Sequence, residues 1–149
     1  MVKRILLSSL AGAVVISLLA SFFFGFLLAD FFASSLPADL AGVSRQTPNF
    51  GLIVVADFLY AIMLAFVLDS LAGTKTFRRG ATVGMIIGFA VMLHFDLISH
   101  ATTRLNTPAT IAVNVVVSTF MSALAAGVIA AVLGRLESAS QSAGEREAE

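Results

Sequence analysis

The sequence has no cysteine, and charged residues are scarce. Without cysteine there is no disulfide framework and no thiolate zinc site. Charged residues make up 12% of the 149 residues, about half the share typical of a soluble domain. The net charge is zero and no basic stripe occurs, so we expect no nucleic-acid partner. No P-loop, HExxH, nucleophile elbow or glycine-rich cofactor motif is present, so we expect no cofactor and a non-enzymatic protein.

Long apolar runs dominate the chain instead. Hydrophobic residues make up 58% of the sequence, and the mean hydropathy is +0.98. Four runs lie at about 5–32, 50–71, 80–100 and 109–133. Each has about 20 residues or more, enough to cross a hydrocarbon core of about 30 Å as a helix. Because lipid leaves no backbone group unpaired, helices are the expected form.

The sequence therefore predicts an all-α integral membrane bundle of four transmembrane helices in one domain, residues 1–136. Pro108 is suited to open the fourth helix. Residues 137–149 are small, polar and acidic, which predicts a disordered tail. The start of the chain resembles a signal peptide, with Lys3 and Arg4 as its basic region. Its apolar run is longer than the roughly 7–15 residues of a cleaved signal, so we expect an uncleaved first span.

The basic residues predict the orientation of the bundle. Seven of the nine lie on one side of the four spans: Lys3, Arg4, Lys75, Arg78, Arg79, Arg135 and Arg146. Only Arg45 and Arg104 lie on the other. Both termini and the loop between the second and third spans should therefore be cytoplasmic. No organelle transit pattern is present, which leaves a bacterial inner membrane as the simplest location.

Small residues recur at every fourth position, which places them on one helix face. The first run carries Ser9, Ala13, Ser17, Ser21, Gly25, Ala29 and Ala33. The third carries Gly80, Gly84 and Gly88, a double GxxxG pattern, and the fourth carries Thr110, Asn114, Ser118, Ser122, Ala126, Ala130 and Gly134. The second has a weaker row of Asp57, Ala61, Ala65 and Asp69. Such faces let membrane helices approach closely, so we predict helix packing along them, within the chain or with a partner.

Polar residues are concentrated at the end of the third run, in the stretch HFDLISHATTR. Asp96 and His100 continue the glycine row, whereas His94 lies on the opposite side of the helix. Counted from the basic loop at 1.5 Å per residue, Asp96 lies about 25 Å and Asp57 about 27 Å into the membrane. The resulting candidate polar cluster near the outer boundary comprises Asp30, Asp57, Asp96, His100 and Asn114, with Arg104 and Arg45 just outside it. Tyr60 is one helical turn from Asp57.

Several interpretations of this cluster are open. Asp96 or Asp57 with Arg104 forms a structural salt bridge in one of them. The surplus of outer carboxylates over arginines instead favours a cation, bound protons or a cationic ligand, and a pocket for a small organic or lipid ligand is a third alternative. Asp96 and His100 are two potential metal ligands, too few to identify a metal. Asp69 beside Lys75 predicts a local ion pair.

Three segments carry a resemblance to a known family. They are LLADFF (Leu27–Phe32), the third-span segment Lys75–Leu105 and VNVVVSTFMSALAAGVIAAVLG (Val113–Gly134). Together they resemble small bacterial four-span membrane proteins of unassigned function, in which a glycine-rich span is followed by an FDL-like step and an ATTNL-like turn. Here Arg104 stands at a position where that turn has a different residue. The resemblance implies a four-span fold and no activity.

The leading functional hypothesis is a small, non-enzymatic inner-membrane protein. It would be an accessory or assembly subunit that associates with itself or with another membrane protein through its small-residue rows, with the lipid bilayer as its surroundings. The alternative is a transporter- or channel-like protein that uses the outer Asp/His cluster for a cation, a proton or a small ligand. A membrane enzyme has the least basis, because Asp96 and His100 alone make no catalytic constellation.

Overall fold

All regular secondary structure in the described part of the chain is helical, and that part contains no strand. The computed structural model describes residues 2–40 and 47–147, with side chains as far as residue 142. Arg45 and the side chain of Arg146 lie outside the described residues. The α-helices are α1 (Val2–Phe22), α2 (Ala29–Ser35), α3 (Phe50–Phe66), α4 (Phe77–Thr102) and α5 (Pro108–Glu147). Short π-helical turns at Phe23–Leu27 and Val67–Leu71 follow α1 and α3, and a 3-10 turn spans Ala38–Leu40.

Four helical segments are long and apolar enough to cross a membrane. They are Val2–Leu27, Phe50–Leu71, Phe77–Thr102 and Pro108–Ser142, and each overlaps one of the four predicted runs. Two of these helices have a side-chain cap at their N-terminus. Asn49 Oδ1 accepts the Leu52 N–H of α3, and Thr107 Oγ1 accepts the Thr110 N–H of α5, both at 3.2 Å. As predicted, α5 begins at Pro108.

The first and last helices differ from their predicted boundaries. The predicted single helix 5–32 is interrupted, because the backbone leaves helical geometry at Leu28 (φ −113°, ψ 4°) before α2 begins. The tail that was predicted to be disordered is instead helical to Glu147. Extending a helix that a span has already nucleated requires no new nucleus. Glutamate and alanine make up seven of the thirteen tail residues, and both favour that extension.

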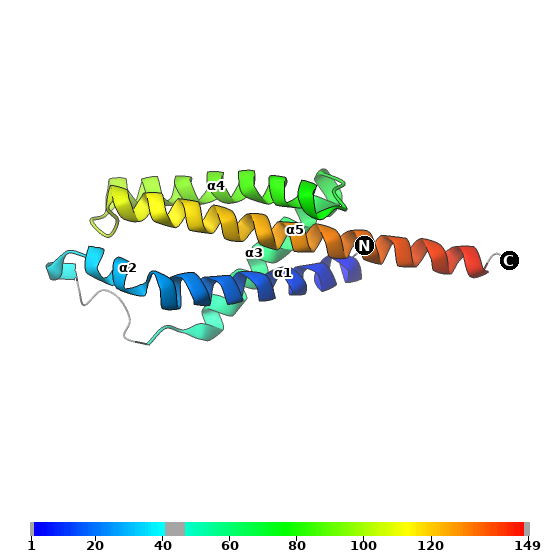
Figure 1. Ribbon diagram of the computed structural model, residues 1–149, viewed down its shortest axis with the longest axis horizontal. Coiled ribbons are helices and arrows are strands. Elements are labelled where there is room, and N and C mark those ends of the chain that lie inside the picture. The colour runs from blue at the N-terminus through cyan, green and yellow to red at the C-terminus, as the bar shows by residue number, and fades with distance from the viewer. Residues whose placement is uncertain (1, 41–46, 148–149) are drawn as a thin grey trace.

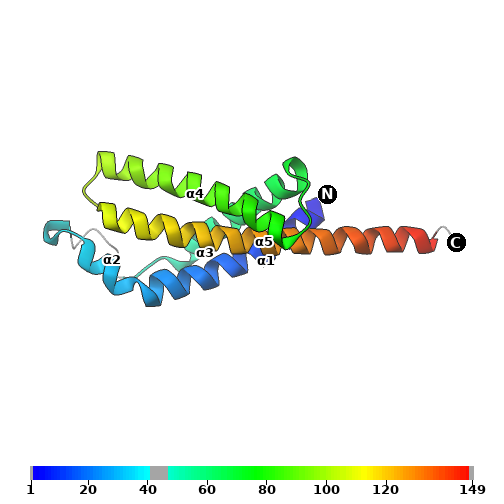
Figure 2. The same cartoon turned by 45° about the horizontal axis from the view of Figure 1, so that its top comes forward.

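The bundle is arranged around α5, which packs against α1, α3 and α4. Figure 1 shows α4 antiparallel to α5 on one side and α1 on the other, with α3 crossing obliquely behind. The rotated view in Figure 2 shows the same order and the C-terminal part of α5 extending beyond the other helices. Both termini and the α3–α4 connection lie at one end, and the α4–α5 turn lies at the other (Figure 1).

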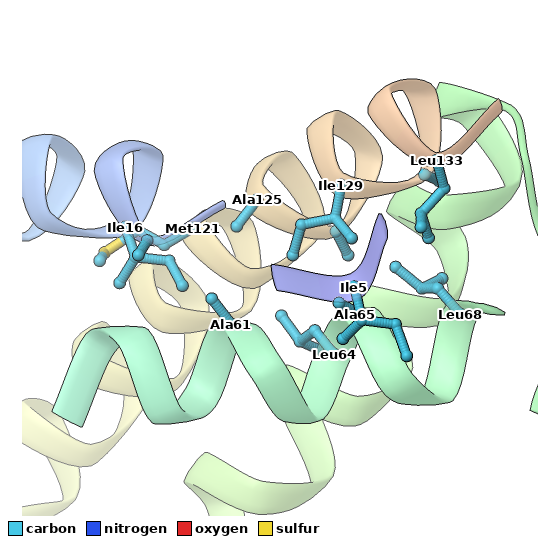
Figure 3. Close-up of a cluster of buried hydrophobic side chains, with 13 residues drawn as sticks. Ile5, Ile16, Ala61, Leu64, Ala65, Leu68, Met121, Ala125, Ile129 and Leu133 are labelled. Carbon is cyan, nitrogen blue, oxygen red and sulfur yellow. The ribbon is translucent and has the colours of Figure 1, made fainter. Parts of the chain in front are cut away.

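Two different kinds of packing hold these helices. Figure 3 shows the apolar core between α1, α3 and α5, which includes Ile16, Leu64 and Ile129. In contrast, α4 meets α5 through glycines: Gly80, Gly84 and Gly88 are all buried. A Cβ atom added to Gly88 would lie 2.5 Å from the Ser122 Cβ, and one added to Gly80 would lie 2.6 Å from the Ala126 carbonyl oxygen. The glycine row of α4 therefore packs directly on the small-residue row of α5.

Candidate functional site

Asp96 is buried between α4 and α5, where two amides hydrogen-bond its carboxylate. The residue is 3% exposed. Asn114 Nδ2 donates to Asp96 Oδ2 at 2.7 Å, and Asn106 Nδ2 donates to Oδ1 at 3.5 Å. Ser118 Oγ in turn donates to Asn114 Oδ1 at 3.3 Å. The structure thus brings Asp96 and Asn114 together in a small network that ties the two helices to each other and to the turn between them.

Three other residues of the predicted cluster lie elsewhere. His100 is exposed, and its Nδ1 lies 2.7 Å from the Asn106 carbonyl oxygen. Arg104 pairs with Asp39 at 3.2 Å in an exposed contact, so the predicted salt bridge of Arg104 with Asp96 or Asp57 is wrong. The reason is that α4 ends at Thr102, so the helical row does not continue to Arg104. Asp30 is exposed on α2.

Asp57 lies on α3 and contacts α1 instead of α4. Ser17 Oγ of α1 donates to Asp57 Oδ2 at 2.6 Å, the only hydrogen bond to this carboxylate among the described residues. Asp57 precedes Asp69 by twelve residues, which is about 18 Å along a helix. If the apolar layer of about 30 Å begins near Asp69, Asp57 lies well inside it.

The count of about 27 Å from Lys75 to Asp57 assumed a continuous helix between these two residues, and that assumption is wrong. The helical backbone ends at Leu71, and Gly73 adopts the left-handed conformation (φ 55°). The Thr74 N–H then bonds back to the Leu68 carbonyl oxygen at 2.8 Å. Glycine adopts this left-handed, chain-reversing conformation more readily than any other residue, because it has no Cβ atom. Lys75 is thereby returned to the level of Asp69, with which it pairs, so the helical path from the basic loop to Asp57 is about 18 Å and not about 27 Å.

A partly open pocket of about 310 Å³ lies beside Asp57, between the spans. Its polar lining residues are Asp57, Tyr60, Ser118 and Ser122, and most of the remaining wall is apolar. The Tyr60 hydroxyl lies 2.8 Å from Ser122 Oγ, and Ser122 Oγ donates to the Gly84 carbonyl oxygen at 2.8 Å. Tyr60 therefore joins α3 to the α4–α5 contact.

Neither Asp96 nor His100 lines this pocket. The single outer cluster predicted from the sequence is thus divided in two. One part is the hydrogen-bond network of Asp96 and Asn114, and the other is the pocket beside Asp57. Ser118 borders both, since it donates to Asn114 and lines the pocket.

A network of four charged side chains closes the opposite end of the bundle. Asp69 has a side chain that is only 2% exposed, and it accepts hydrogen bonds from Arg4 Nη2 at 2.8 and 3.0 Å and from Lys75 Nζ. Glu137 of α5 lies 3.8 Å from Arg4 Nη1 and 3.6 Å from Lys75 Nζ. The predicted Asp69–Lys75 ion pair is confirmed. Arg4 and Glu137 were missed, because nothing in their local sequence indicates a partner so far away in the chain.

The described residues contain no group of three His, Cys, Asp or Glu side chains that could hold a metal ion. Asp96 and His100 do not form a joint metal site, because the His100 imidazole contacts Asn106 and the Asp96 carboxylate contacts Asn114. The Asp57 pocket offers one carboxylate. Its other polar groups are hydroxyls, which are weak ligands for transition metals.

The described fold is an all-helical bundle, and its four long apolar helices suggest a membrane protein. No protein-family model matches this chain, and neither a curated protein nor a solved structure matches it. What the protein does is therefore inferred from its own geometry.

Proposed function

We propose that this chain is a four-span protein of the bacterial inner membrane with both termini in the cytoplasm. We further propose that it is a non-enzymatic subunit that associates with a second copy of itself or with another membrane protein. Large apolar side chains that point away from the bundle support the membrane location. Leu18, Ile86 and Val116, on three different helices, are 66%, 64% and 68% exposed, which suits contact with lipid.

The observation that carries the association is the uncovered outer half of the small-residue row in the first span. The small-residue rows of α4 and α5 pack against each other, and Ser9 and Ala13 of α1 are buried inside the bundle. Further along the same row, Ser21 and Gly25 are exposed, and a Cβ atom on Gly25 would meet no atom within 4 Å. An exposed small-residue face lets a further membrane helix approach closely.

Replacing Gly25 by leucine should separate the associated subunits without unfolding them. Overpacking of a helix contact costs about 1–3 kcal/mol, which corresponds to a loss of association of roughly fivefold to 150-fold. Native mass spectrometry of the protein released from mild detergent measures the oligomeric state. The matched control is Phe26→Leu, which changes a neighbouring side chain that is 79% exposed.

We expect the Gly25→Leu protein to be monomeric and to keep the wild-type thermal midpoint, because a Cβ atom at that position would meet no other helix in the described part of the chain. Oligomers that persist in Gly25→Leu would contradict the proposed contact. A wild-type protein that is monomeric in both detergent and lipid nanodiscs would contradict self-association and leave only a different membrane protein as partner.

The orientation has a separate test. Cysteines introduced singly at Ser35 and Ser140 should react differently with an impermeant maleimide in intact cells. Since seven of nine basic residues lie on the side of the termini, we expect labelling at position 35 and none at position 140 until the cells are opened. The reverse pattern would show that both termini face outward.

The transporter- or channel-like alternative has less support in its original form. It required Asp57, Asp96 and His100 to converge on one cavity, and neither Asp96 nor His100 lines the pocket beside Asp57. The Asp96 carboxylate is satisfied by amides, which suits a structural role.

A further inference from the structure

The polar groups around the Asp57 pocket present hydrogen-bond acceptors to it. A hydroxyl has a single proton to donate. Ser122 uses its proton on the Gly84 carbonyl oxygen, so the Tyr60 hydroxyl is the donor in the Tyr60–Ser122 pair. Ser118 donates to Asn114. The hydroxyl oxygens of Tyr60 and Ser118 can therefore accept a hydrogen bond from a ligand in the pocket but cannot donate one. The Asp57 carboxylate, which also lines the pocket, is an acceptor as well.

Asp57 has no cationic partner among the described residues. Its one hydrogen bond comes from the neutral Ser17 hydroxyl, whereas the buried carboxylate of Asp69 is paired with Arg4 and Lys75. An intramembrane carboxylate at this depth is costly, about 2.5–3.5 kcal/mol on insertion scales, and such residues commonly mark a ligand path. A pocket with acceptor oxygens and one carboxylate favours a positively charged occupant.

The walls of the pocket distinguish between kinds of cation. Hard metal ions take six or more oxygen ligands, and this pocket supplies too few that are not already engaged with each other. Phe24, Met92 and Met121 line it, together with alanine and isoleucine side chains. These surfaces suit hydrocarbon, and an aromatic ring also attracts a cation held over its face. A volume of about 310 Å³ is at the lower end of the range for small-molecule sites.

We propose that this pocket binds a small lipophilic organic cation, such as a substituted ammonium ion, with its charge at Asp57 and its hydrocarbon part against the apolar wall. Ala56 of α3 lines the pocket and is exposed, so the pocket is open beside α3. This site goes beyond the proposed subunit role and does not depend on it. Binding is measured on the protein whether or not it oligomerises.

Benzyltrimethylammonium chloride is a suitable probe, because its charge is permanent and it is small enough for the pocket. Isothermal titration calorimetry on the full chain in nanodiscs, at constant chloride, should detect binding to the wild type. Asp57→Asn keeps an acceptor for Ser17 but removes the charge, and it should weaken binding by about tenfold or more. The control, Asp39→Asn, neutralises an exposed carboxylate that does not line the pocket and should leave the affinity unchanged.

A second pair of variants tests the location of the site by filling the pocket instead of removing its charge. Ala20 lines the pocket, so Ala20→Leu should fill it and reduce the affinity. Ala90 is exposed on α4 away from the pocket, so Ala90→Leu should have no effect. The proposal is overturned if the wild type does not bind the probe, if Asp57→Asn binds as well as the wild type, or if the two leucine variants behave alike. A rise in the thermal midpoint of the protein with sodium chloride but not with the probe would assign the pocket to a metal ion. That result would also overturn the proposal.

Discussion

Gly84→Leu is expected to lower the free energy of unfolding by about 3 kcal/mol, the upper part of the range for an overpacked core. A Cβ atom at this position would lie 2.5 Å from the Ser122 carbonyl oxygen and closer still to the Ala126 side chain. Backbone atoms of α5 cannot move aside as the end of a flexible side chain would. The two helices must therefore separate, which also breaks the hydrogen bond from Ser122 to the Gly84 carbonyl oxygen.

The loss should be large because α4 depends on this one contact. Its main neighbour is α5, and the apolar core of the bundle is formed by the other three spans. Membrane helices also gain little from a hydrophobic driving force against each other, so close packing carries the association. Unfolding in mixed micelles with increasing sodium dodecyl sulfate measures the change. Ile86→Leu is the matched control, since Ile86 is 64% exposed on the other side of α4. Equal stability of the two variants would refute the glycine contact.

Asp69→Ala should be the most damaging single change at the charged end of the bundle. It leaves Arg4 and Lys75 without the carboxylate that binds both. Removing one partner of a buried ion pair typically costs about 3–5 kcal/mol. We expect a value near the lower end, because the Arg4 and Lys75 side chains are 29% and 25% exposed and still have Glu137 nearby.

Asp39→Ala provides the comparison for that experiment. It breaks the Asp39–Arg104 pair, in which the side chains are 58% and 75% exposed. Exposed ion pairs contribute about 0–1 kcal/mol, so this variant should unfold almost as the wild type does. The same detergent titration measures both variants. If Asp69→Ala and Asp39→Ala had equally small effects, the Asp69 network would have no role in holding α1, α5 and the α3–α4 connection together.

The spans and the packing face of α4 were predictable from the sequence. A run of about 20 apolar residues has few alternatives to a membrane-crossing helix, because lipid leaves no backbone group unpaired. The spacing of Gly80, Gly84 and Gly88 by four residues places them on one face in any α-helix. Asp96 shares that face, and it is buried at the same interface as the glycines. These features depend on local geometry and composition alone.

The partners of the polar residues were decided only by the tertiary structure. Helical periodicity states which residues share a face but not which helix lies opposite, so Asp57 pairs with Ser17 of α1 while Asp96 pairs with Asn114 of α5. The depth of Asp57 depended on where the backbone turns, and Gly73 turns it before Lys75. Arg4 and Glu137 meet because the two ends of the chain lie at the same end of the bundle. Each of these contacts joins residues far apart in the sequence, and their positions are fixed by how whole helices pack, which no local pattern encodes.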